Sequence, residues 1–257
     1  MPDELTRCLH VAIRAAKLAG RHQLASVGTD LGVASKGGRT GLVTRVDREC
    51  EELIVECIGS EFPDHALLGE EGGRTGAPSD YTWIIDPLDG TGNYAHGYPF
   101  YGVSIALSVA GVLEVGVILD SVREELFTAR RGAGACANGA PIAVSKTAEL
   151  GQCLISTGFA ELNNLAAFAR ATRQVRGVRV PGPAAINLAA VACGRLDAFW
   201  EPGVKPWDIA AGLVIVREAG GSATDGRGNS ATPDTDMLVC SNGRLHGAIL
   251  GLLASGP

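Results

Sequence analysis

The chain has 257 residues and a formal net charge of −6, from 22 Lys and Arg against 28 Asp and Glu. This acidic balance argues against a basic surface for nucleic acid or anionic lipid, and no run approaches the ~20 apolar residues of a membrane span. The seven Cys form no CxxC pair and the N-terminus lacks an apolar signal segment. We therefore expect reduced thiols, a cytoplasmic location and no membrane partner.

The first part of the chain predicts two amphipathic helices joined by a loop. Apolar residues recur at helical spacing over 5–19, and Gly20 or Gly28 would end this helix. A polar, glycine-rich loop follows over 32–41, and a second helix is expected over 47–59. Three glutamates would form the solvent-exposed face of this second helix: Glu51, Glu52 and Glu56.

Short apolar runs in the middle of the chain predict strands. Two of them, over 66–68 and 83–85, run straight into acidic residues. Three more would form a meander over 101–109, 113–119 and 124–128. Two dipeptides are typical of the tight turns in such a meander: Ala110-Gly111 and Asn138-Gly139.

The last part of the chain alternates strands with helices. The strands are expected over 154–156, 196–200 and 237–240, and the helices over 162–174, 184–193, 207–219 and 244–253. We find no internal repeat and no linker, so we expect one domain over 1–257 with two halves, about 1–148 and 149–257. Helices mixed with a strand meander indicate a layered α/β or α+β fold.

The densest chemical signal is the motif Asp86-Pro87-Leu88-Asp89-Gly90-Thr91, which follows the strand predicted over 83–85. A turn stiffened by proline can aim both carboxylates and the Leu88 carbonyl at one point, and Mg²⁺ prefers oxygen ligands of this kind. If a helix begins here, the backbone N–H groups of Gly90 and Thr91 would form an anion site. The plain alternative is an Asp-Gly turn with a capping aspartate.

Further carboxylates accompany this motif. Glu70-Glu71 follows the strand over 66–68 and would lie beside Asp86 if the two strands are neighbours. Asp208 opens a helix, and Glu201 ends the strand over 196–200. Taken singly, each has a plain alternative. Glu70-Glu71 would be a solvated face, Asp208 a partner of the helix dipole, and Glu201 a solvent-facing strand end. Together, carboxylates without Lys or Arg partners repel one another, so a fold that gathers them needs cations between them.

These motifs resemble the inositol monophosphatase family of lithium-sensitive, magnesium-dependent phosphatases. The matching stretches follow the family's order over nearly the whole chain, with Leu42-Val43-Thr44 and Asp47 as a softer match: Gly69-Glu70-Glu71, Trp83-Ile84-Ile85-Asp86-Pro87-Leu88-Asp89-Gly90-Thr91-Gly92-Asn93-Tyr94 and Glu201-Pro202-Gly203-Val204-Lys205-Pro206-Trp207-Asp208. The resemblance implies a layered α-β-α-β-α sandwich, a homodimer, and a small phosphate monoester as substrate.

The resemblance also implies roles for individual residues, all of them present in this sequence. One Mg²⁺ would be bound by Glu70, Asp86 and the Leu88 carbonyl, a second by Asp86, Asp89 and Asp208, and a third, weaker one by Glu70 through water. The catalytic set would be Glu70, Asp47 and Thr91, with Asp47 and Thr91 activating the attacking water. Phosphate would be held by the backbone of Gly90 and Thr91, and inositol hydroxyls by Ala184 and Glu201. Lys36 falls where the family often has a lysine near the metal loop.

Three positions depart from the family pattern. Gly41 replaces the aspartate that commonly precedes Leu-Val-Thr, which affects the rigidity of that loop. Gly92 replaces a bulkier residue, and Pro183 stands where Ser or Thr is usual beside Ala184. The last two departures concern the substrate side more than the metal ligands.

The expected reaction is the Mg²⁺-dependent hydrolysis of inositol 1-phosphate to inositol and phosphate by metal-activated water. Fructose-1,6-bisphosphatase, histidinol-phosphatase and 3′-phosphoadenosine phosphatase are rivals within the superfamily, but the stretch Asn93-Tyr94-Ala95-His96-Gly97-Tyr98-Pro99 looks more like inositol monophosphatases. A rival of another class is a non-enzymatic regulatory protein that acts on RNA or the transcription machinery. The complete acidic set favours an enzyme, and the net charge argues against direct RNA binding.

Overall fold

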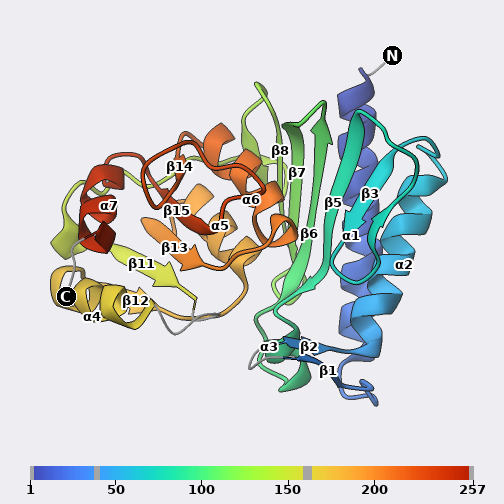
Figure 1. Cartoon of the computed structure of the whole chain (residues 1–257), viewed down its shortest axis with the longest axis horizontal. Coiled ribbons are helices and arrows are strands. Elements are labelled where there is room, and N and C mark those ends of the chain that lie inside the picture. The colour runs from blue at the N-terminus through green and yellow to red at the C-terminus, as the bar shows by residue number, and fades with distance from the viewer. Residues whose placement is uncertain (1–2, 38–40, 159–163, 255–257) are drawn as a thin grey trace.

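The computed structural model describes residues 3–37, 41–158 and 164–254, which form alternating layers of helices and sheets (Figure 1). A first helix pair covers an eight-stranded sheet, a second pair lies between this sheet and a five-stranded one, and a third pair covers the outer face of the smaller sheet. This is the α-β-α-β-α sandwich that we expected, because each apolar sheet face needs a covering layer.

The first layer contains α1 (Glu4–Ser26) and α2 (Arg45–Gly59). Small side chains on the buried face of α1 let it lie close to the large sheet. A Cβ at Gly20 would stand 2.5 Å from Leu119 Cδ2, so Gly20 is a packing residue inside the helix. The helix instead ends just before Gly28, whose φ of +81° favours glycine. Of the two helix ends allowed by the sequence, the structure selects the second.

The large sheet has the order β10-β9-β8-β7-β6-β5-β3-β4. The neighbours β3 and β5 are parallel, and the remaining pairs in the sheet are antiparallel. Positive φ angles at Ala110-Gly111 and Asn138-Gly139 confirm both predicted turns. The strands are β3 (Ala66–Gly69), β4 (Gly73–Thr75), β5 (Tyr81–Asp89), β6 (Gly102–Val109), β7 (Val112–Asp120), β8 (Glu125–Arg130), β9 (Ala135–Ala137) and β10 (Ala140–Pro141).

The middle layer contains α5 (Ala184–Ala192) and α6 (Pro206–Glu218), which are apolar on nearly all sides. A helix of this kind is buried all round, and here the two sheets cover it from both directions. The core between the sheets therefore joins residues from both halves of the sequence.

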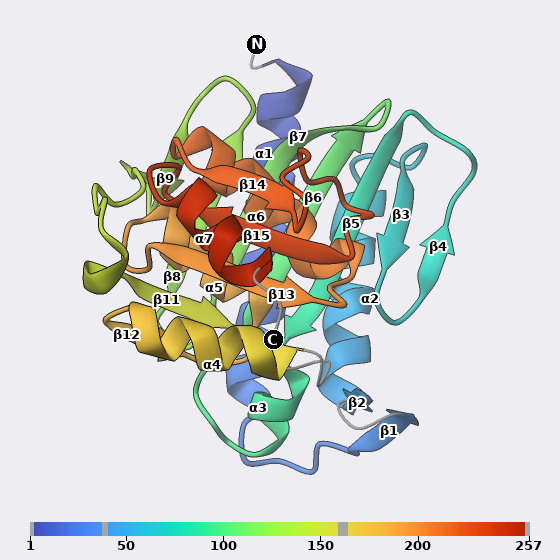
Figure 2. The same ribbon diagram turned by 60° about the vertical axis from the view of Figure 1, so that its left-hand side comes forward.

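The smaller sheet has the order β12-β11-β13-β15-β14 and is covered on its outer face by α4 (Leu165–Gln174) and α7 (His246–Ala254). Figure 2 shows these two helices in front of the sheet. Residues 162 and 163, where we expected α4 to begin, lie outside the described residues. The strands are β11 (Leu154–Thr157), β12 (Gly177–Arg179), β13 (Ala198–Pro202), β14 (Ser222–Asp225) and β15 (Met237–Ser241).

A separate two-stranded hairpin lies near the start of α2, at one end of the large sheet (Figure 1). The region 32–41, which we expected to be a loop, contains β1 (Ala34–Gly37), and this strand pairs with β2 (Gly41–Val43). That prediction was wrong because the strand is polar and exposed along its length, so it carries no apolar signal. The remaining short elements are α3 (Thr91–Ala95) and the 3₁₀ turn η1 (Leu150–Gln152).

The seven cysteines are free thiols, as expected, and five of them are buried. Within the described ranges, no helix is both long enough and apolar enough to cross a membrane.

Candidate active site

The acidic motif lies in a bulge at the end of β5. Asp86 pairs with Ser104 and Asp89 with Gly102 on β6, so three steps along β5 match two along its partner. The extra residue turns this segment out of the ladder around Pro87, which has no N–H to donate. The buried Gln23 of α1 holds the bulge by donating its amide N–H to the Pro87 carbonyl at 2.8 Å.

Glu70 reaches the same place from the neighbouring strand. The parallel register of β3 and β5 pairs Gly69 with Ile85, so Glu70 follows directly beside Asp86. Its backbone N–H donates to the Ile85 carbonyl at 3.2 Å. This confirms the expectation that the two strands are neighbours and bring their acidic ends together.

Asp47 and Thr91 contact each other although 44 residues separate them. The Thr91 hydroxyl lies 2.7 Å from Asp47 Oδ1 and 3.2 Å from the Leu88 carbonyl, and both atoms can accept its proton. Asp47 is fully buried, and its other oxygen accepts the Thr44 backbone N–H at 2.8 Å. This capping box fixes the first turn of α2. The helix begins at Arg45, two residues before the start that the sequence predicted. A helix does begin at Thr91, as the motif allowed.

The second half of the chain contributes Asp208 and Glu201. Asp208 lies in the first turn of α6, and its Oδ2 accepts the Lys205 backbone N–H at 2.7 Å. Glu201 lies within β13 and is 8% exposed, so the alternative of a solvent-facing strand end is wrong. The Gly158 backbone lies against its carboxylate: a Cβ there would stand 1.8 Å from Glu201 Oε1.

A cavity of about 520 Å³ joins these segments. Asp47, Asp86 and the Leu88 side chain lie behind its wall and are buried. The other predicted site residues line it directly, together with the departures Gly41, Gly92 and Pro183: Lys36, Glu70, Asp89, Gly90, Thr91, Ala184, Glu201 and Asp208.

Burial and mutual repulsion shift the titration of these carboxyls. Burial is the main cause that raises the pKa of Asp86, and the charges of Glu70, Asp89 and Asp208 add to it. Burial, Asp208 and Glu201 similarly raise the pKa of Asp89, although the Ala185 N–H at 2.7 Å opposes them. Burial raises the pKa of Asp208 to about 7. Carboxyls that resist ionisation in this way are stabilised as anions when a cation lies between them.

This set of oxygen donors fits a hard divalent cation. Among the residues that the structure describes, no three Asp, Glu, His or Cys side chains converge into a finished metal site. Asp86 and Asp208 accept backbone N–H groups, and Glu70 is turned onto a lysine. Mg²⁺ prefers carboxylate and carbonyl oxygens, and these carboxylates outnumber the cationic side chains beside them, so the residues present fit this ion.

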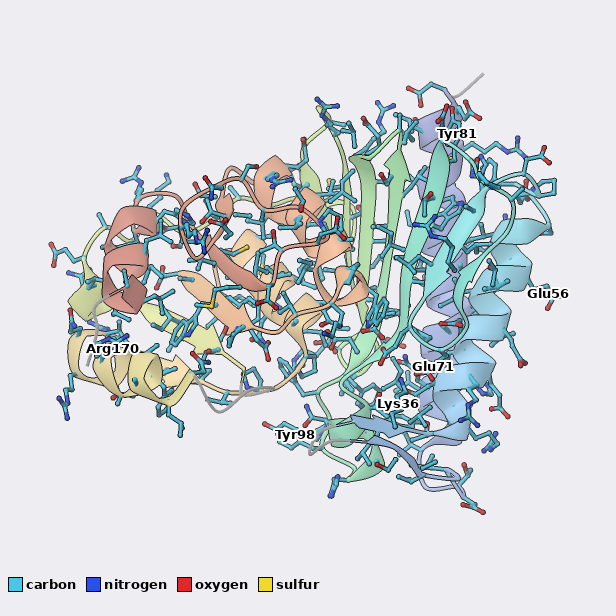
Figure 3. The ribbon with its side chains drawn as sticks, in the orientation of Figure 1. Lys36, Glu56, Glu71, Tyr81, Tyr98 and Arg170 are labelled. Carbon is cyan, nitrogen blue, oxygen red and sulfur yellow. The ribbon has the colours of Figure 1, made fainter. Side chains whose placement is uncertain are left out.

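Lys36 corrects the expectation that the carboxylates have no basic partner. Its ammonium donates to Glu70 Oε1 at 2.8 Å and also bonds Glu71 (Figure 3). Burial lowers the pKa of Lys36, but these two carboxylates outweigh it and raise the pKa overall. The sequence did not predict the Lys36–Glu70 pair, because β1 and the loop after β3 are distant in sequence and meet only in the tertiary structure.

The structure gives a reason for one of the departures. A Cβ at Gly41 would stand 2.4 Å from the Gly37 carbonyl oxygen, so an aspartate does not fit this hairpin. Pro183 packs on the site itself, since its Cγ would lie 2.6 Å from a Cβ at Gly90. Around Gly92 nothing lies within 4 Å of a Cβ, and the structure does not explain that glycine.

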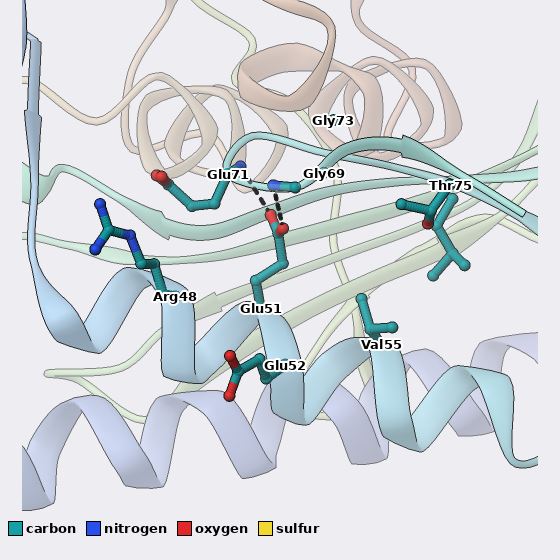
Figure 4. A pocket seen from close by; sticks show the side chains of 10 residues that line it. Arg48, Glu51, Glu52, Val55, Gly69, Glu71, Gly73 and Thr75 are labelled. Carbon is teal, nitrogen blue, oxygen red and sulfur yellow. Dashed lines mark hydrogen bonds between the residues drawn. The ribbon is translucent and has the colours of Figure 1, made fainter.

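Sequence reasoning missed one residue that contacts the loop carrying Glu70. We expected Glu51 on the exposed face of its helix, but it is only 7% exposed. It accepts the backbone N–H groups of Glu71 and Gly72 (Figure 4). Its spacing contained a usable signal: Glu51 is one helical turn after Asp47 and one turn before the buried Ile54, on the same stripe.

Comparisons with known proteins agree with the fold and identify the family. The model of the inositol monophosphatase family matches residues 4–256. The chain is 42% identical to the inositol-1-monophosphatase of Synechocystis sp., over 100% of this chain and 92% of that protein. It is 41% identical to the Nus factor SuhB of Pseudomonas aeruginosa, over 94% of both chains. The solved structure of the inositol monophosphatase from Anabaena superposes with a TM-score of 0.90 at 40% identity, over 99% of this chain and 98% of that one. The chain therefore belongs to the inositol monophosphatase family.

Proposed function

We propose that this protein is a Mg²⁺-dependent phosphomonoesterase that hydrolyses inositol monophosphate to inositol and phosphate. One observation carries the proposal: carboxylates from three separate segments, Glu70, Asp89 and Asp208, line one cavity and repel one another. Such an arrangement is costly without cations and useful with them. The phosphatase assignment accords with the family and with the name of the Synechocystis relative.

Two or three Mg²⁺ ions would be held by the residues that the resemblance assigns. Glu70, Asp86 and the Leu88 carbonyl would bind the first ion, and Asp86, Asp89 and Asp208 the second, with Glu70 also facing a third, weaker ion. Mg²⁺ in such a site lowers the pKa of water and stabilises the negative charge of the phosphoryl group. The bulge in β5 supports this division, because it lets Asp86 and Asp89 serve one site from a single strand end.

The attacking water would give its proton to groups supplied by this chain. Thr91 would accept a hydrogen bond from the water, while its own hydroxyl donates to Asp47. Asp47 is fixed by the Thr44 N–H, so the pair keeps one orientation. Glu70, which follows β3 and lines the cavity, would complete the catalytic set.

The remaining wall of the cavity would bind the substrate. Gly90 and Thr91 open α3, and their N–H groups are suited to the phosphate. Ala184 and Glu201 lie across the cavity and would contact inositol hydroxyls. A buried carboxylate accepts hydrogen bonds from vicinal hydroxyls and repels a second phosphate.

Replacement of Thr91 tests the water-activating pair. Thr91→Ala is expected to lower kcat by roughly 10²-fold or more, the scale of lost general-base assistance. Thr91→Ser keeps the hydroxyl that donates to Asp47 and should retain much of the activity. Steady-state kinetics at saturating Mg²⁺ gives the comparison. Equal and small losses in both variants would leave Thr91 with a structural role only, through its bonds to Asp47 and the Leu88 carbonyl.

Replacement of Glu201 tests substrate recognition. Glu201→Gln should raise KM for inositol 1-phosphate more than KM for 4-nitrophenyl phosphate, which has no polyol to bind. Contacts of this kind contribute roughly 0.5–3 kcal/mol, so the expected difference is about 2- to 150-fold. Parallel changes in both KM values would show that Glu201 acts on the fold or on the metals.

A panel of phosphate monoesters, assayed with and without Mg²⁺, tests the substrate assignment. Inositol monophosphate should give the highest kcat/KM. If fructose 1,6-bisphosphate, histidinol phosphate or 3′-phosphoadenosine 5′-phosphate is at least tenfold better, the inositol assignment is wrong and the phosphatase assignment stands.

A second candidate function follows from the names of several relatives. The Pseudomonas aeruginosa relative is a Nus factor, and a protein of that name from Escherichia coli is 38% identical to this chain. We infer as the alternative a regulatory member that acts on RNA or the transcription machinery. Such a protein would bind a partner without turnover, so the monoester panel separates the two functions.

We extend the proposal to a single-domain protein that works as a cytoplasmic homodimer. Both halves of the chain supply residues to the cavity, which favours one functional unit over 1–257. Tyr98 and Val180 are 53% and 48% exposed. Each lies close in sequence to a carbonyl that the side-chain amide of Asn93 bonds: Tyr98 is near Phe100, and Val180 is next to Pro181. Exposed aromatic and aliphatic side chains of this kind suit a subunit interface.

A further inference from the structure

Glu51 links α2 to the loop that carries Glu70. Its carboxylate comes from the buried face of the helix and uses both oxygens: Oε2 accepts the Glu71 N–H at 3.0 Å, and Oε1 accepts the Gly72 N–H at 2.6 Å. Figure 4 shows the carboxylate directly beneath this loop. Two charge-assisted bonds to consecutive amides fix the path of the backbone more firmly than a single bond would.

Two glycines make room for this carboxylate. A Cβ at Gly69 would stand 2.4 Å from Glu51 Oε2, and one at Gly72 would stand 2.7 Å from Oε1. Neither glycine has a positive φ, so backbone conformation does not require them. The glycines on either side of Glu70-Glu71 are therefore explained by the close approach of Glu51.

The loop is thus held from two sides at the position of Glu70. The N–H of Glu70 bonds to β5 at Ile85, next to Asp86, and the two following N–H groups bond to Glu51. Asp47, one helical turn earlier on α2, bonds Thr91 in the other ligand segment. One rigid helix therefore sets the distance between the two segments that carry the carboxylates.

We propose that Glu51 is a positioning residue that holds Glu70 in register with Asp86 and Asp89 for cation binding, an inference that rests on the proposed function. Glu51 itself touches no reacting group, because it lies on the helix side of the loop, in a separate cavity of about 370 Å³. Its effect is exerted through the backbone of residues 70–72. Residues that orient metal ligands in this way typically change metal affinity by about 10–100-fold when replaced.

Glu51→Gln is the direct test, because the shape of the side chain is kept. The amide presents one oxygen and one NH₂ group, so one of the two backbone N–H groups faces a donor. Calorimetric titration of the EDTA-stripped full chain with Mg²⁺ should show the dissociation constant raised about 10–100-fold. Because Glu51 does not touch the reactants, kcat should approach the wild-type value when Mg²⁺ is saturating.

Glu52→Gln is the matched control. Glu52 is the next residue on the helix, is exposed, lines the same cavity and loses the same charge. Its Mg²⁺ dissociation constant should stay within about twofold of wild type, as surface substitutions usually do. Gly69→Ala is a second variant that keeps Glu51 and displaces its carboxylate, and it should weaken Mg²⁺ binding in the same direction.

Amide hydrogen exchange in EDTA measures how firmly the backbone of residues 70–72 is held when no metal is bound. The N–H groups of Glu71 and Gly72 should exchange about tenfold or more faster in Glu51→Gln than in wild type or Glu52→Gln. If exchange quickens but Mg²⁺ affinity does not change, Glu51 is only structural and the inference is overturned. Unchanged exchange and affinity in a folded Glu51→Gln variant overturn it as well. Failure of the wild type to bind Mg²⁺ is a different result, which refutes the proposed function itself.

Discussion

Chelation of divalent cations is expected to abolish phosphate release, and added Mg²⁺ should restore it. The reason is the excess of carboxylates over cations at the cavity: the ammonium of Lys36 is bonded to Glu70 and Glu71, and among the described residues no lysine or arginine side chain forms a salt bridge with Asp86, Asp89 or Asp208. Metal stabilisation of the transition state contributes several kcal/mol. A loss of about 4 kcal/mol corresponds to roughly 10³-fold in rate.

The measurement is phosphate release from inositol 1-phosphate in excess EDTA and after readdition of Mg²⁺. The melting temperature in EDTA serves as the control, since a folded but inactive protein shows that the cations act on the reaction. Li⁺ should inhibit the Mg²⁺-restored activity, as the resemblance implies. Full turnover in excess EDTA would falsify the metal-dependent mechanism.

Asp89→Asn should remove most of the activity and leave the fold intact. Asparagine still offers an oxygen to the Ala185 N–H but carries no charge for the cation. The loss in kcat/KM should be about 10²-fold or more, corresponding to the approximately 3 kcal/mol or more that an uncompensated charge costs in a buried site. The raised pKa of Asp89 means that its ionised form destabilises the metal-free protein, so the melting temperature in EDTA should not fall.

The pH dependence follows from the same shift. A carboxyl whose pKa is higher in the folded than in the unfolded state binds more protons when folded, so stability declines as the pH rises between the two values. For Asp208 these values are 3.8 and about 7. In EDTA the melting temperature of the wild type should therefore fall between about pH 4 and pH 7, and this fall should be smaller in Asp89→Asn, which removes a second carboxyl whose pKa is raised.

Asp197→Asn is a suitable control for both measurements. Asp197 is also buried, but it accepts bonds from the Ser145 hydroxyl and the Leu154 N–H, away from the cavity. Its replacement should lower the melting temperature and leave the Mg²⁺ dependence unchanged. If Asp89→Asn instead behaves like Asp197→Asn, with lower stability and surviving activity, Asp89 is a structural cap.

The sequence by itself determined the layered fold and the residues that could bind a cation or take part in a reaction. Long amphipathic periods predicted α1 and α2, and apolar runs that end in acids located β3, β5 and β13 within a few residues. These signals are local: a strand that is buried on both faces is apolar along its length, and a turn with Pro and Gly has a recognisable composition. The family resemblance rested on the same local motifs.

Only the tertiary structure decided which partners these residues have. Lys36 meets Glu70 because an exposed polar hairpin folds back, and no apolar pattern marks such a strand. Glu201 is buried because β15 and the Gly158 backbone lie against it, which strand bounds alone do not predict. Glu51 is charged, so composition assigns it to solvent, yet two amides 20 and 21 residues away hold it inside. Burial of a charge depends on donors that are distant in sequence, and only the folded chain brings them within reach.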